Sequence, residues 1–256
     1  MREEDLRRLE EEIDKLRMKI LDSDEFKVYS EILDRTTLMA LYRLSKKGFI
    51  KALGGVISSG KEANVLHALK NGEEVAVKVY MTYTSDFRNM YEYIQGDPRF
   101  LKVKKDRRSV VMAWARKEFR NLKIAEESGV RAPEALAVDS NVLVMEFIGE
   151  NENPAPRLKD VEDELEKEEM EEICSTVLEY IRRLYRNGEL VHGDVSEYNI
   201  LVHGDEIVLI DFGQAVLNRH PRALEFLKRD IENVSRYFRK FGIEVDAESI
   251  FREVVS

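Results

Sequence analysis

The order of strand-like and helix-like segments constrains the fold of this chain more than any other feature. Segments with strand character are concentrated between residues 49 and 147, and the chain after residue 156 is mostly helical by its apolar spacing. Asn71-Gly72 separates two of the strand-like segments and is a strong signal for a two-residue hairpin turn. Strands grouped before helices are typical of α+β architectures. The sequence therefore predicts an α+β fold with a small antiparallel sheet lobe and a mainly helical lobe.

This pattern divides the chain into three parts. Residues 1–48 are expected to form a helical extension without chemistry of its own, with one amphipathic helix at 6–20 and another from Thr36 to Gly48. Residues 49–148 form the sheet lobe, and residues 149–256 form a truncated helical lobe. The sheet lobe is expected to contain strands at 49–57, 63–69, 74–80, 134–138 and 142–147, a flexible basic insertion at about 81–108 and a helix at 109–128. The helical lobe is expected to contain helices at 161–187, 222–241 and 247–254 and short strands at 200–203 and 207–210.

Three oxygen-bearing side chains in the second lobe indicate phosphoryl transfer. Asp194 and Asn199 lie five residues apart in a loop between a long helix and a strand, and Asp211 follows the apolar end of the next strand. Such a loop can direct Asp194 at a nucleophile, while Asn199 and Asp211 supply oxygens to Mg²⁺, which prefers a few protein oxygens plus phosphate oxygens. Phosphoryl transfer needs little more than positioned phosphates, metal charge and an oriented nucleophile.

Lys78 is the candidate phosphate anchor of the sheet lobe. It lies within the apolar strand 75–79, where a buried cation needs an anionic partner. Glu118 on the following helix is the best candidate for that partner, although Glu126 and Glu127 lie on the same helix.

Two further segments are expected to contact a nucleotide. The glycine-rich stretch 54–61 lies between the first two strands, and its backbone N–H groups and serine hydroxyls can bind phosphate oxygens. The last strand of the sheet lobe ends at the connector, where exposed backbone groups can bind an adenine edge. The candidate nucleotide contacts are Ile57, Ser58, Ser59, Gly60, Lys61, Lys78, Met145, Glu146, Ile148 and Asn199.

Charge and composition limit the location and partners of the chain. The net charge of −9 argues against general nucleic-acid affinity, but residues 99–123 hold ten Lys or Arg against two acidic residues, a local charge of +8. That segment suits a phosphate-rich partner such as RNA, or is a solvated helix face and loop. A single cysteine, Cys174, excludes an internal disulfide. Without a signal peptide or an apolar run of ~20 residues, the expected location is cytoplasmic.

Two stretches make the chain resemble the RIO family of atypical serine/threonine kinases, within the protein kinase superfamily. The resemblance covers about residues 49 to 240, and it is to the branch without an N-terminal winged helix. The stretches are Ser58-Ser59-Gly60-Lys61-Glu62-Ala63-Asn64-Val65 and His192-Gly193-Asp194-Val195-Ser196-Glu197-Tyr198-Asn199.

The resemblance implies a two-lobed protein-kinase-like fold that uses ATP and Mg²⁺, for which Mn²⁺ can substitute. Asp194 would be the catalytic base, Asn199 and Asp211 the metal ligands, and Lys78, with Glu118, the phosphate contact. Family members act in late maturation of the small ribosomal subunit, and some are thought to work as ATPases whose metal-binding aspartate, here Asp211, is transiently phosphorylated. The 99–123 segment would then face pre-ribosomal RNA. Candidate self-phosphorylation sites are Thr82, Ser85 and Ser109.

Two alternatives remain open on the sequence. Small-molecule kinases of the aminoglycoside or choline type also use His-Gly-Asp with Asn five residues later and a subsequent Asp. Only 43 residues follow Gly213 and no Ala-Pro-Glu-like element is among them, so a peptide substrate is less secure than ATP binding. A non-catalytic nucleotide-binding scaffold is disfavoured, because every expected catalytic position is filled.

Overall fold

The structure is a computed structural model that describes residues 34–82 and 87–256, together with positions 7, 11 and 15. The predicted helix at 6–20 lies outside the continuously described residues. The chain divides into two compact units. Among the described residues, unit 1 comprises 34–82, 87–94, 102–119 and 135–154, and unit 2 comprises 95–101, 120–134 and 155–256.

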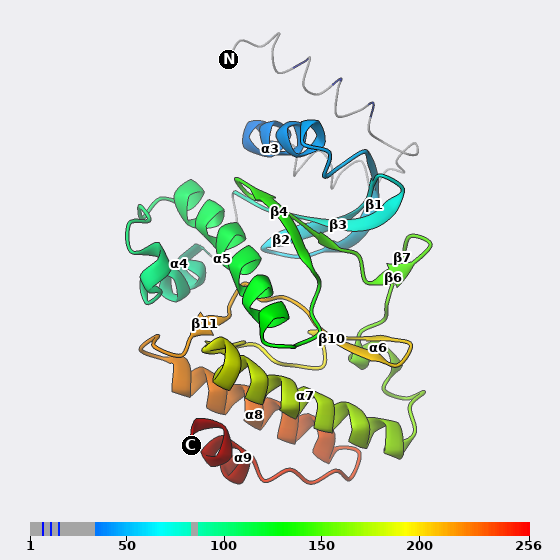
Figure 1. The fold of residues 1–256 in the computed structure, drawn as a ribbon, viewed down its shortest axis with the longest axis vertical. Helices are drawn as coiled ribbons and strands as arrows, with labels where there is room; N and C mark the ends of the chain where they lie inside the picture. The colour runs from blue at the N-terminus through cyan, green and yellow to red at the C-terminus, as the bar shows by residue number, and fades with distance from the viewer. Residues whose placement is uncertain (1–6, 8–10, 12–14, 16–33, 83–86) are drawn as a thin grey trace. The chain divides into compact units, whose positions relative to one another are not determined.

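Unit 1 is built on a five-stranded antiparallel sheet with the strand order β1-β2-β3-β5-β4 (Figure 1). Asn71 and Gly72, with φ of 54° and 92°, form the predicted turn between β2 and β3. Positive φ at both central residues is what a tight hairpin of this kind requires. A second antiparallel pair, β6 and β7, follows the sheet. The strands are β1 (Ala52–Ser59), β2 (Ala63–Lys70), β3 (Glu73–Tyr80), β4 (Ala135–Asp139), β5 (Val142–Glu146), β6 (Gly149–Glu150) and β7 (Asn153–Pro154).

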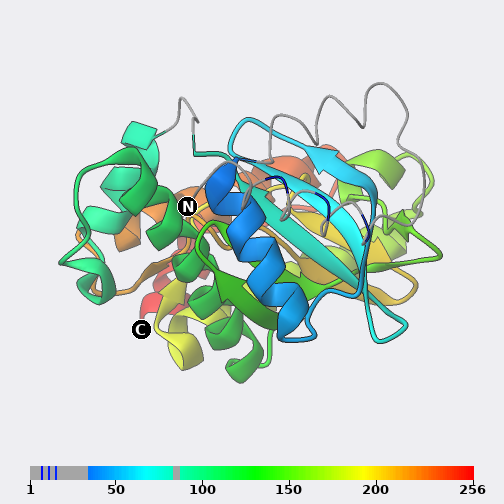
Figure 2. The ribbon, with the colours of Figure 1, turned by 90° about the horizontal axis from the view of Figure 1, so that it is seen from above.

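Helix α3 (Arg35–Lys46) covers one face of this sheet, as the view from above shows (Figure 2). Asp34 begins the helix by accepting a hydrogen bond from the Thr37 N–H group at 2.8 Å. The apolar stripe of Leu38, Leu41 and Leu44 is buried in one cluster with residues of β1, β2, β3 and β5. The predicted second helix of the extension is therefore part of the core of unit 1.

The predicted flexible insertion contains regular structure. α4 (Phe87–Gln95) and the 3₁₀ helix η1 (Pro98–Phe100) precede α5 (Arg107–Glu127), which contributes residues to both units. α4 is strongly amphipathic and buries Met90 and Ile94. Aromatic residues are interspersed among the polar residues of this helix, so its helical period is easily missed in the sequence.

In unit 2, the helices α7, α8 and α9 pack against one another (Figure 1). The prediction of one helix over 161–187 is wrong at its start. α6 ends at Val161, and α7 begins only at Lys167, where Glu166 and Glu169 satisfy the first free backbone N–H groups as a capping box. The helices are α6 (Leu158–Val161), α7 (Lys167–Gly188), α8 (Ala223–Arg239) and α9 (Ala247–Val255).

Two short antiparallel strand pairs complete unit 2 and carry the loops of interest. β9 (Ile200–His203) pairs with β10 (Glu206–Leu209), and β8 (Leu190–Val191) pairs with β11 (Val216–Leu217). The loop from β8 to β9 contains Asp194 and Asn199, and the loop from β10 to β11 contains Asp211. No helix in the described part of the chain is both long enough and apolar enough to cross a membrane.

The packing of α3 gives a stability prediction. Leu41 has none of its surface exposed, so Leu41→Ala should lower the free energy of unfolding by about 2–5 kcal/mol through lost burial and a residual cavity. Denaturant titration followed by circular dichroism measures the change. Lys47→Ala, at an exposed position just after the helix, is the control and should change stability by less than about 0.5 kcal/mol. Equal effects of the two substitutions would contradict the core position of α3.

Candidate active site

A buried carboxylate on α8 holds the backbone of the loop that carries Asp194. The Gly193 and Val195 N–H groups donate to the two carboxylate oxygens of Asp230, at 2.7 Å and 3.0 Å. The neighbouring Arg229 guanidinium donates to the Gly193 carbonyl oxygen. Burial raises the pKa of Asp230 to about 7, while the two backbone hydrogen bonds and Arg229 act in the opposite direction. The loop is thus fixed on both sides of Asp194.

Asp230 and Arg229 were not predicted as site residues, although the sequence contains a signal. α8 has a regular apolar stripe that includes Phe226, Ile231 and Val234, and Asp230 lies on the buried side with them. A carboxylate at an apolar position of an amphipathic helix needs hydrogen-bond donors from elsewhere in the protein. The sequence does not identify which loop supplies them.

The structure brings Asp194 and Asn199 into direct contact. The Asn199 Nδ2 atom donates to the Asp194 main-chain oxygen at 2.9 Å and to its Oδ2 at 3.1 Å. The Gln214 Nε2 donates to the same carboxylate oxygen at 3.3 Å. Because both bonds of Asn199 use the amide nitrogen, its Oδ1 is not engaged by them and is suited to a cation.

The Asp194 carboxyl has an unusual pKa for an aspartate. Burial, and next the negative charge of Asp211, raise the pKa of Asp194 to about 6, against the opposing effects of Arg229 and Asn199. The effect of Asp211 places its carboxylate within electrostatic reach of Asp194. A carboxylate with a raised pKa is a better proton acceptor near neutral pH than an ordinary aspartate.

The backbone of Asp211 is held in a conformation that residues other than glycine rarely adopt. Its φ is +64°, in the left-handed region, and its side chain is exposed. The next residue, Phe212, is fully buried with its ring 4.6 Å from the His192 ring in an edge arrangement. The Ile210 N–H group donates to the Asn199 carbonyl oxygen at 3.0 Å, which brings the backbone beside Asp211 next to Asn199. Backbone strain of this kind is concentrated at functional sites.

The donor set of Asn199 and Asp211 fits a magnesium ion. Both residues offer oxygen, and in the described residues no three His, Cys, Asp or Glu side chains gather as a metal-binding group. A closed zinc site would need such a group. Mg²⁺ is usually held by one or two protein carboxylates together with waters and phosphate oxygens, so two oxygen ligands are enough.

Unit 1 holds Lys78 and Glu118 as a buried ion pair. The Lys78 Nζ lies 2.8 Å from the Glu118 Oε1, and the side chains are 11% and 1% exposed. Glu126 and Glu127, the alternatives from the sequence, are exposed and belong to the part of α5 in unit 2. A buried pair that loses one partner leaves an uncompensated charge, so the two residues depend on each other.

The glycine-rich stretch differs from its predicted form. Ile57, Ser58 and Ser59 belong to β1, so the strand runs two residues further than predicted and the turn to β2 begins at Gly60. The Gly60 N–H group donates to the Ala63 carbonyl oxygen at 3.0 Å, which closes this turn. The pairing of β1 with β2 shifts register near Val56, which lets the strand continue past its two glycines. Ser58, Ser59, Gly60 and Lys61 are exposed.

The connector after β5 is tied to the sheet by Glu74. Its carboxylate accepts hydrogen bonds from the N–H groups of Asn151 and Glu152, at 3.2 Å and 2.7 Å, and it lies 2.9 Å from the His67 Nε2. Met145 and Glu146 lie in β5 opposite Ala76 and Val75, and Ile148 is 5% exposed. Glu74 was not predicted as a site residue. Its position, two residues after the hairpin turn, carries no sequence signal for this contact.

The ten cations of residues 99–123 do not form a single surface. Lys117 is fully buried, with its Nζ 5.1 Å from the Trp114 ring centre, and Arg99 is engaged by Asp97 and Asn121. The segment is also divided between the two units. The exposed cations are Lys102, Lys104, Lys105, Arg107, Arg108, Arg116 and Arg120.

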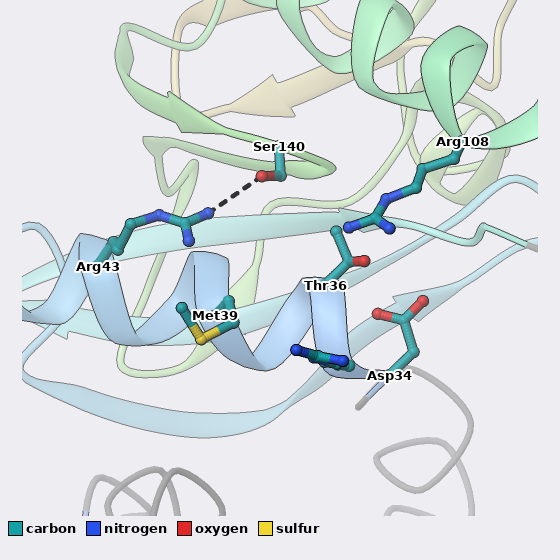
Figure 3. A pocket seen from close by; sticks show the side chains of 7 residues that line it. Asp34, Thr36, Met39, Arg43, Arg108 and Ser140 are labelled. Carbon is teal, nitrogen blue, oxygen red and sulfur yellow. Dashed lines mark hydrogen bonds between the residues drawn. The ribbon is translucent and has the colours of Figure 1, made fainter. Parts of the chain in front are cut away.

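A pocket of about 560 Å³ lies beside α3 in unit 1 and contains none of the predicted site residues (Figure 3). The Arg43 Nη2 donates to the Ser140 hydroxyl at 3.1 Å across its edge, and the Arg43 Nε donates to the Asp139 Oδ2 at 2.8 Å. The Arg43 hydrogen bond holds the pKa of Asp139 below its ordinary value. These contacts attach α3 to the turn between β4 and β5.

Comparison with known proteins identifies the class to which this fold and site belong. The family model described as the RIO domain matches residues 64–250. RIO-type serine/threonine-protein kinase Rio1 of Haloferax volcanii is 48% identical over 249 residues, which cover 97% of this chain and 84% of the relative. Rio1 of Methanocaldococcus jannaschii is 43% identical over 231 residues, or 90% and 78% of the two chains. Human RIO1 is 40% identical over 230 residues, or 89% and 40%.

A solved structure gives the same fold. The crystal structure of the Rio2 kinase-ADP/Mg²⁺-phosphoaspartate complex from Chaetomium thermophilum superposes with a TM-score of 0.62 at 21% identity, over 85% of this chain and 66% of that one. The chain is a protein of the kinase-like α+β fold. It belongs to the RIO family. The predicted fold class and the predicted family are both confirmed.

The proximity of the two carboxylates gives a prediction for titration. Asp211→Asn removes a negative charge that raises the pKa of Asp194, so the Asp194 midpoint should move from about 6 toward lower pH. Carbon NMR of the aspartate carboxyl groups in metal-free protein measures it. Asp205→Asn, in the exposed turn after β9, is the control and should leave the midpoint in place. An unchanged midpoint in the Asp211 variant would show that the two carboxylates do not interact.

Proposed function

We propose that this chain is an ATP- and Mg²⁺-dependent serine/threonine protein kinase, an ATPase or both, of RIO type, that acts in small ribosomal subunit maturation. The observation that carries the proposal is the group formed by Asp194, Asn199 and Asp211, in which a carboxylate of raised pKa adjoins two oxygen ligands suited to Mg²⁺. The names of the relatives, which are serine/threonine-protein kinases, support the reaction class.

Each predicted residue has a role in this proposal. Asp194 accepts the proton of the attacking hydroxyl, and Asp230 with Arg229 keeps its loop in place. Asn199 and Asp211 hold the metal, and Lys78, oriented by Glu118, binds phosphate oxygens. The bound Mg²⁺, or Mn²⁺ in its place, supplies positive charge to the phosphates. The remaining nucleotide contacts are Ile57, Ser58, Ser59, Gly60 and Lys61 at the phosphates and Met145, Glu146 and Ile148 at the adenine.

Asp211 is also proposed to accept a phosphoryl group during ATP hydrolysis. Its carboxylate is exposed at a strained backbone position, so it combines access with a fixed direction. The solved Rio2 structure is of a complex that contains a phosphoaspartate, which supports an aspartate as acceptor in this fold. An aspartyl phosphate would divide one transfer into two steps, phosphorylation of the carboxylate and hydrolysis by water.

The partners and location follow from the same assignment. The exposed cations at 102–108 would contact pre-ribosomal RNA, and the protein would act in the cytoplasm. Thr82 and Ser109 remain the described candidates for self-phosphorylation, and Ser85 lies outside the described residues. The Thr82 hydroxyl donates to the Asp34 carboxylate at 2.7 Å and must leave that bond to react.

ATP turnover tests the proposal against a small-molecule phosphotransferase, which would use the same residues. Turnover is measured with purified small-subunit particles and, separately, with small amino alcohols. We expect stimulation by the particles, and Asp194→Ala should reduce turnover at least a hundredfold while nucleotide binding remains. Asp211→Ala should lose the Mg²⁺ dependence of nucleotide affinity. Stimulation by an alcohol and not by particles would overturn the assignment.

RNA association is tested by charge reversal in the exposed part of the basic segment. Replacing Lys102, Lys104 and Lys105 by Glu should weaken binding of small-subunit RNA and flatten its salt dependence, because each neutralised phosphate contact contributes roughly one unit to the slope. Lys228, Arg236 and Lys240 on and after α8 are the matched triple, and their reversal should change little. Equal losses in both triples, or no measurable RNA binding by the parent, would contradict a specific RNA surface at 102–105.

A further inference from the structure

Asn121 on α5 binds the loop that carries Asp211. The residue is fully buried in unit 2, and its Nδ2 donates to the Phe212 carbonyl oxygen at 2.9 Å and to the Ala215 carbonyl oxygen at 2.8 Å. These carbonyls flank Gly213 and Gln214. One amide group therefore closes the loop from both sides, immediately after Asp211.

The orientation of this amide is determined by Arg99. The Arg99 Nη2 donates to the Asn121 Oδ1 at 2.8 Å, so the amide oxygen faces a guanidinium and the nitrogen faces two carbonyls. The flipped amide would place its oxygen against two carbonyl oxygens and its nitrogen against a cation, and all of these contacts would be repulsive. The neighbours of Asn121 thus permit one orientation only.

Arg99 is itself held by a fully buried carboxylate. Asp97 accepts from the Arg99 Nε at 2.9 Å and 3.1 Å, from Nη2 at 2.6 Å, and from the Arg99 N–H group at 2.9 Å. The side chains are 0% and 16% exposed. Paired contacts between a guanidinium and a carboxylate are strong and geometrically specific, so Arg99 has little freedom to turn from Asn121.

The segment that carries Asp97 and Arg99 is packed tightly within unit 2. A Cβ atom on Gly96 would lie 2.0 Å from the His220 Nε2, so only glycine fits between the chain and this buried ring. The Phe100 ring lies 5.7 Å from the Arg99 guanidinium and 5.2 Å from that of Arg120. Residues 95–101 thus belong to unit 2, which also contains the loop 211–215, although they lie in the insertion.

We propose that Asp97, Arg99 and Asn121 form a polar relay that positions the metal-binding loop 211–215. The relay acts on both functional side chains of that loop, Asp211 and Gln214, the second of which donates to the Asp194 carboxylate. Asn121 and Arg99 are positioning residues, because neither contacts the reacting groups. In its reference to Mg²⁺, this inference rests on the proposed function.

Two substitutions separate positioning from simple packing. Asn121→Asp has nearly the same size and keeps the acceptor for Arg99, but it replaces both donors by an oxygen that faces two carbonyls. Arg99→Lys keeps a cation beside buried Asp97, which preserves the fold, but lacks the second donor that reaches Asn121. Asn141→Asp is the matched control, since Asn141 is equally buried and donates to the Tyr80 carbonyl and the Thr37 hydroxyl in unit 1.

The experiment measures Mg²⁺-dependent ADP binding by calorimetry and amide hydrogen exchange over residues 211–216. We expect Asn121→Asp to lose about tenfold in Mg²⁺-dependent affinity, in line with two lost hydrogen bonds, and Arg99→Lys to lose less. Both should accelerate exchange in the loop. Asn141→Asp should change neither reading, even if it lowers the melting temperature by as much.

Four outcomes are informative. Parent-like affinity and exchange in both relay variants would overturn the proposal, and so would equal effects of the Asn141 control. If Asn121→Asp does not fold, Arg99→Lys alone decides it by the same two readings. If the parent protein binds ADP without any Mg²⁺ dependence, the proposed function fails, and hydrogen exchange still decides whether the relay holds the loop.

Discussion

The arrangement of the candidate active site depends on one buried carboxylate, that of Asp230. Its two oxygens accept the N–H groups on either side of Asp194, so the loop conformation is fixed by a residue that comes from a helix further along the chain. A carboxylate without exposed surface is costly unless every oxygen has a donor. The loop backbone satisfies this need, and the loop is fixed in return. The loop therefore stabilises the buried carboxylate, and the carboxylate stabilises the loop conformation.

The same principle recurs at other buried polar side chains of the two units. Lys78 has Glu118, Asn121 has Arg99, and Arg99 has Asp97. In each case a polar group is removed from water and directed by a partner that has few alternatives. The apolar core under α3 contributes stability, but it does not fix the orientation of functional side chains, because apolar contacts are not directional. Orientation in this protein comes from its buried polar groups.

Much of the fold could be predicted from the sequence. The strands, the Asn71-Gly72 turn and the long helices depend on local periodicity and turn chemistry, which the chain displays directly. Other features were not predicted correctly, among them the end of β1. The start of α7 depends on a capping box in a run of many glutamates, where no single residue is distinctive, and α4 lies in a segment whose aromatic and polar residues obscure the period.

Some residues of the candidate site could be suggested from the sequence, and others could not. Asp194, Asn199 and Asp211 could be proposed as site residues because they lie close together in sequence at fixed spacing. Asp230, Asn121 and Glu74 act on backbone groups far away in the chain, and backbone groups carry no residue signature. The sequence shows that Asp230 is a polar residue in an apolar stripe, but the identity of its partners is a property of the tertiary structure.

The left-handed backbone of Asp211 has a consequence for protein engineering. A non-glycine residue in this region costs about 1 kcal/mol or more, and glycine would relieve that cost while deleting the carboxylate. Selection for thermal tolerance alone would therefore favour the loss of this side chain, as happens where activity requires a strained residue. With Asp211 in its proposed role, directed evolution of this protein for heat resistance needs simultaneous selection for turnover.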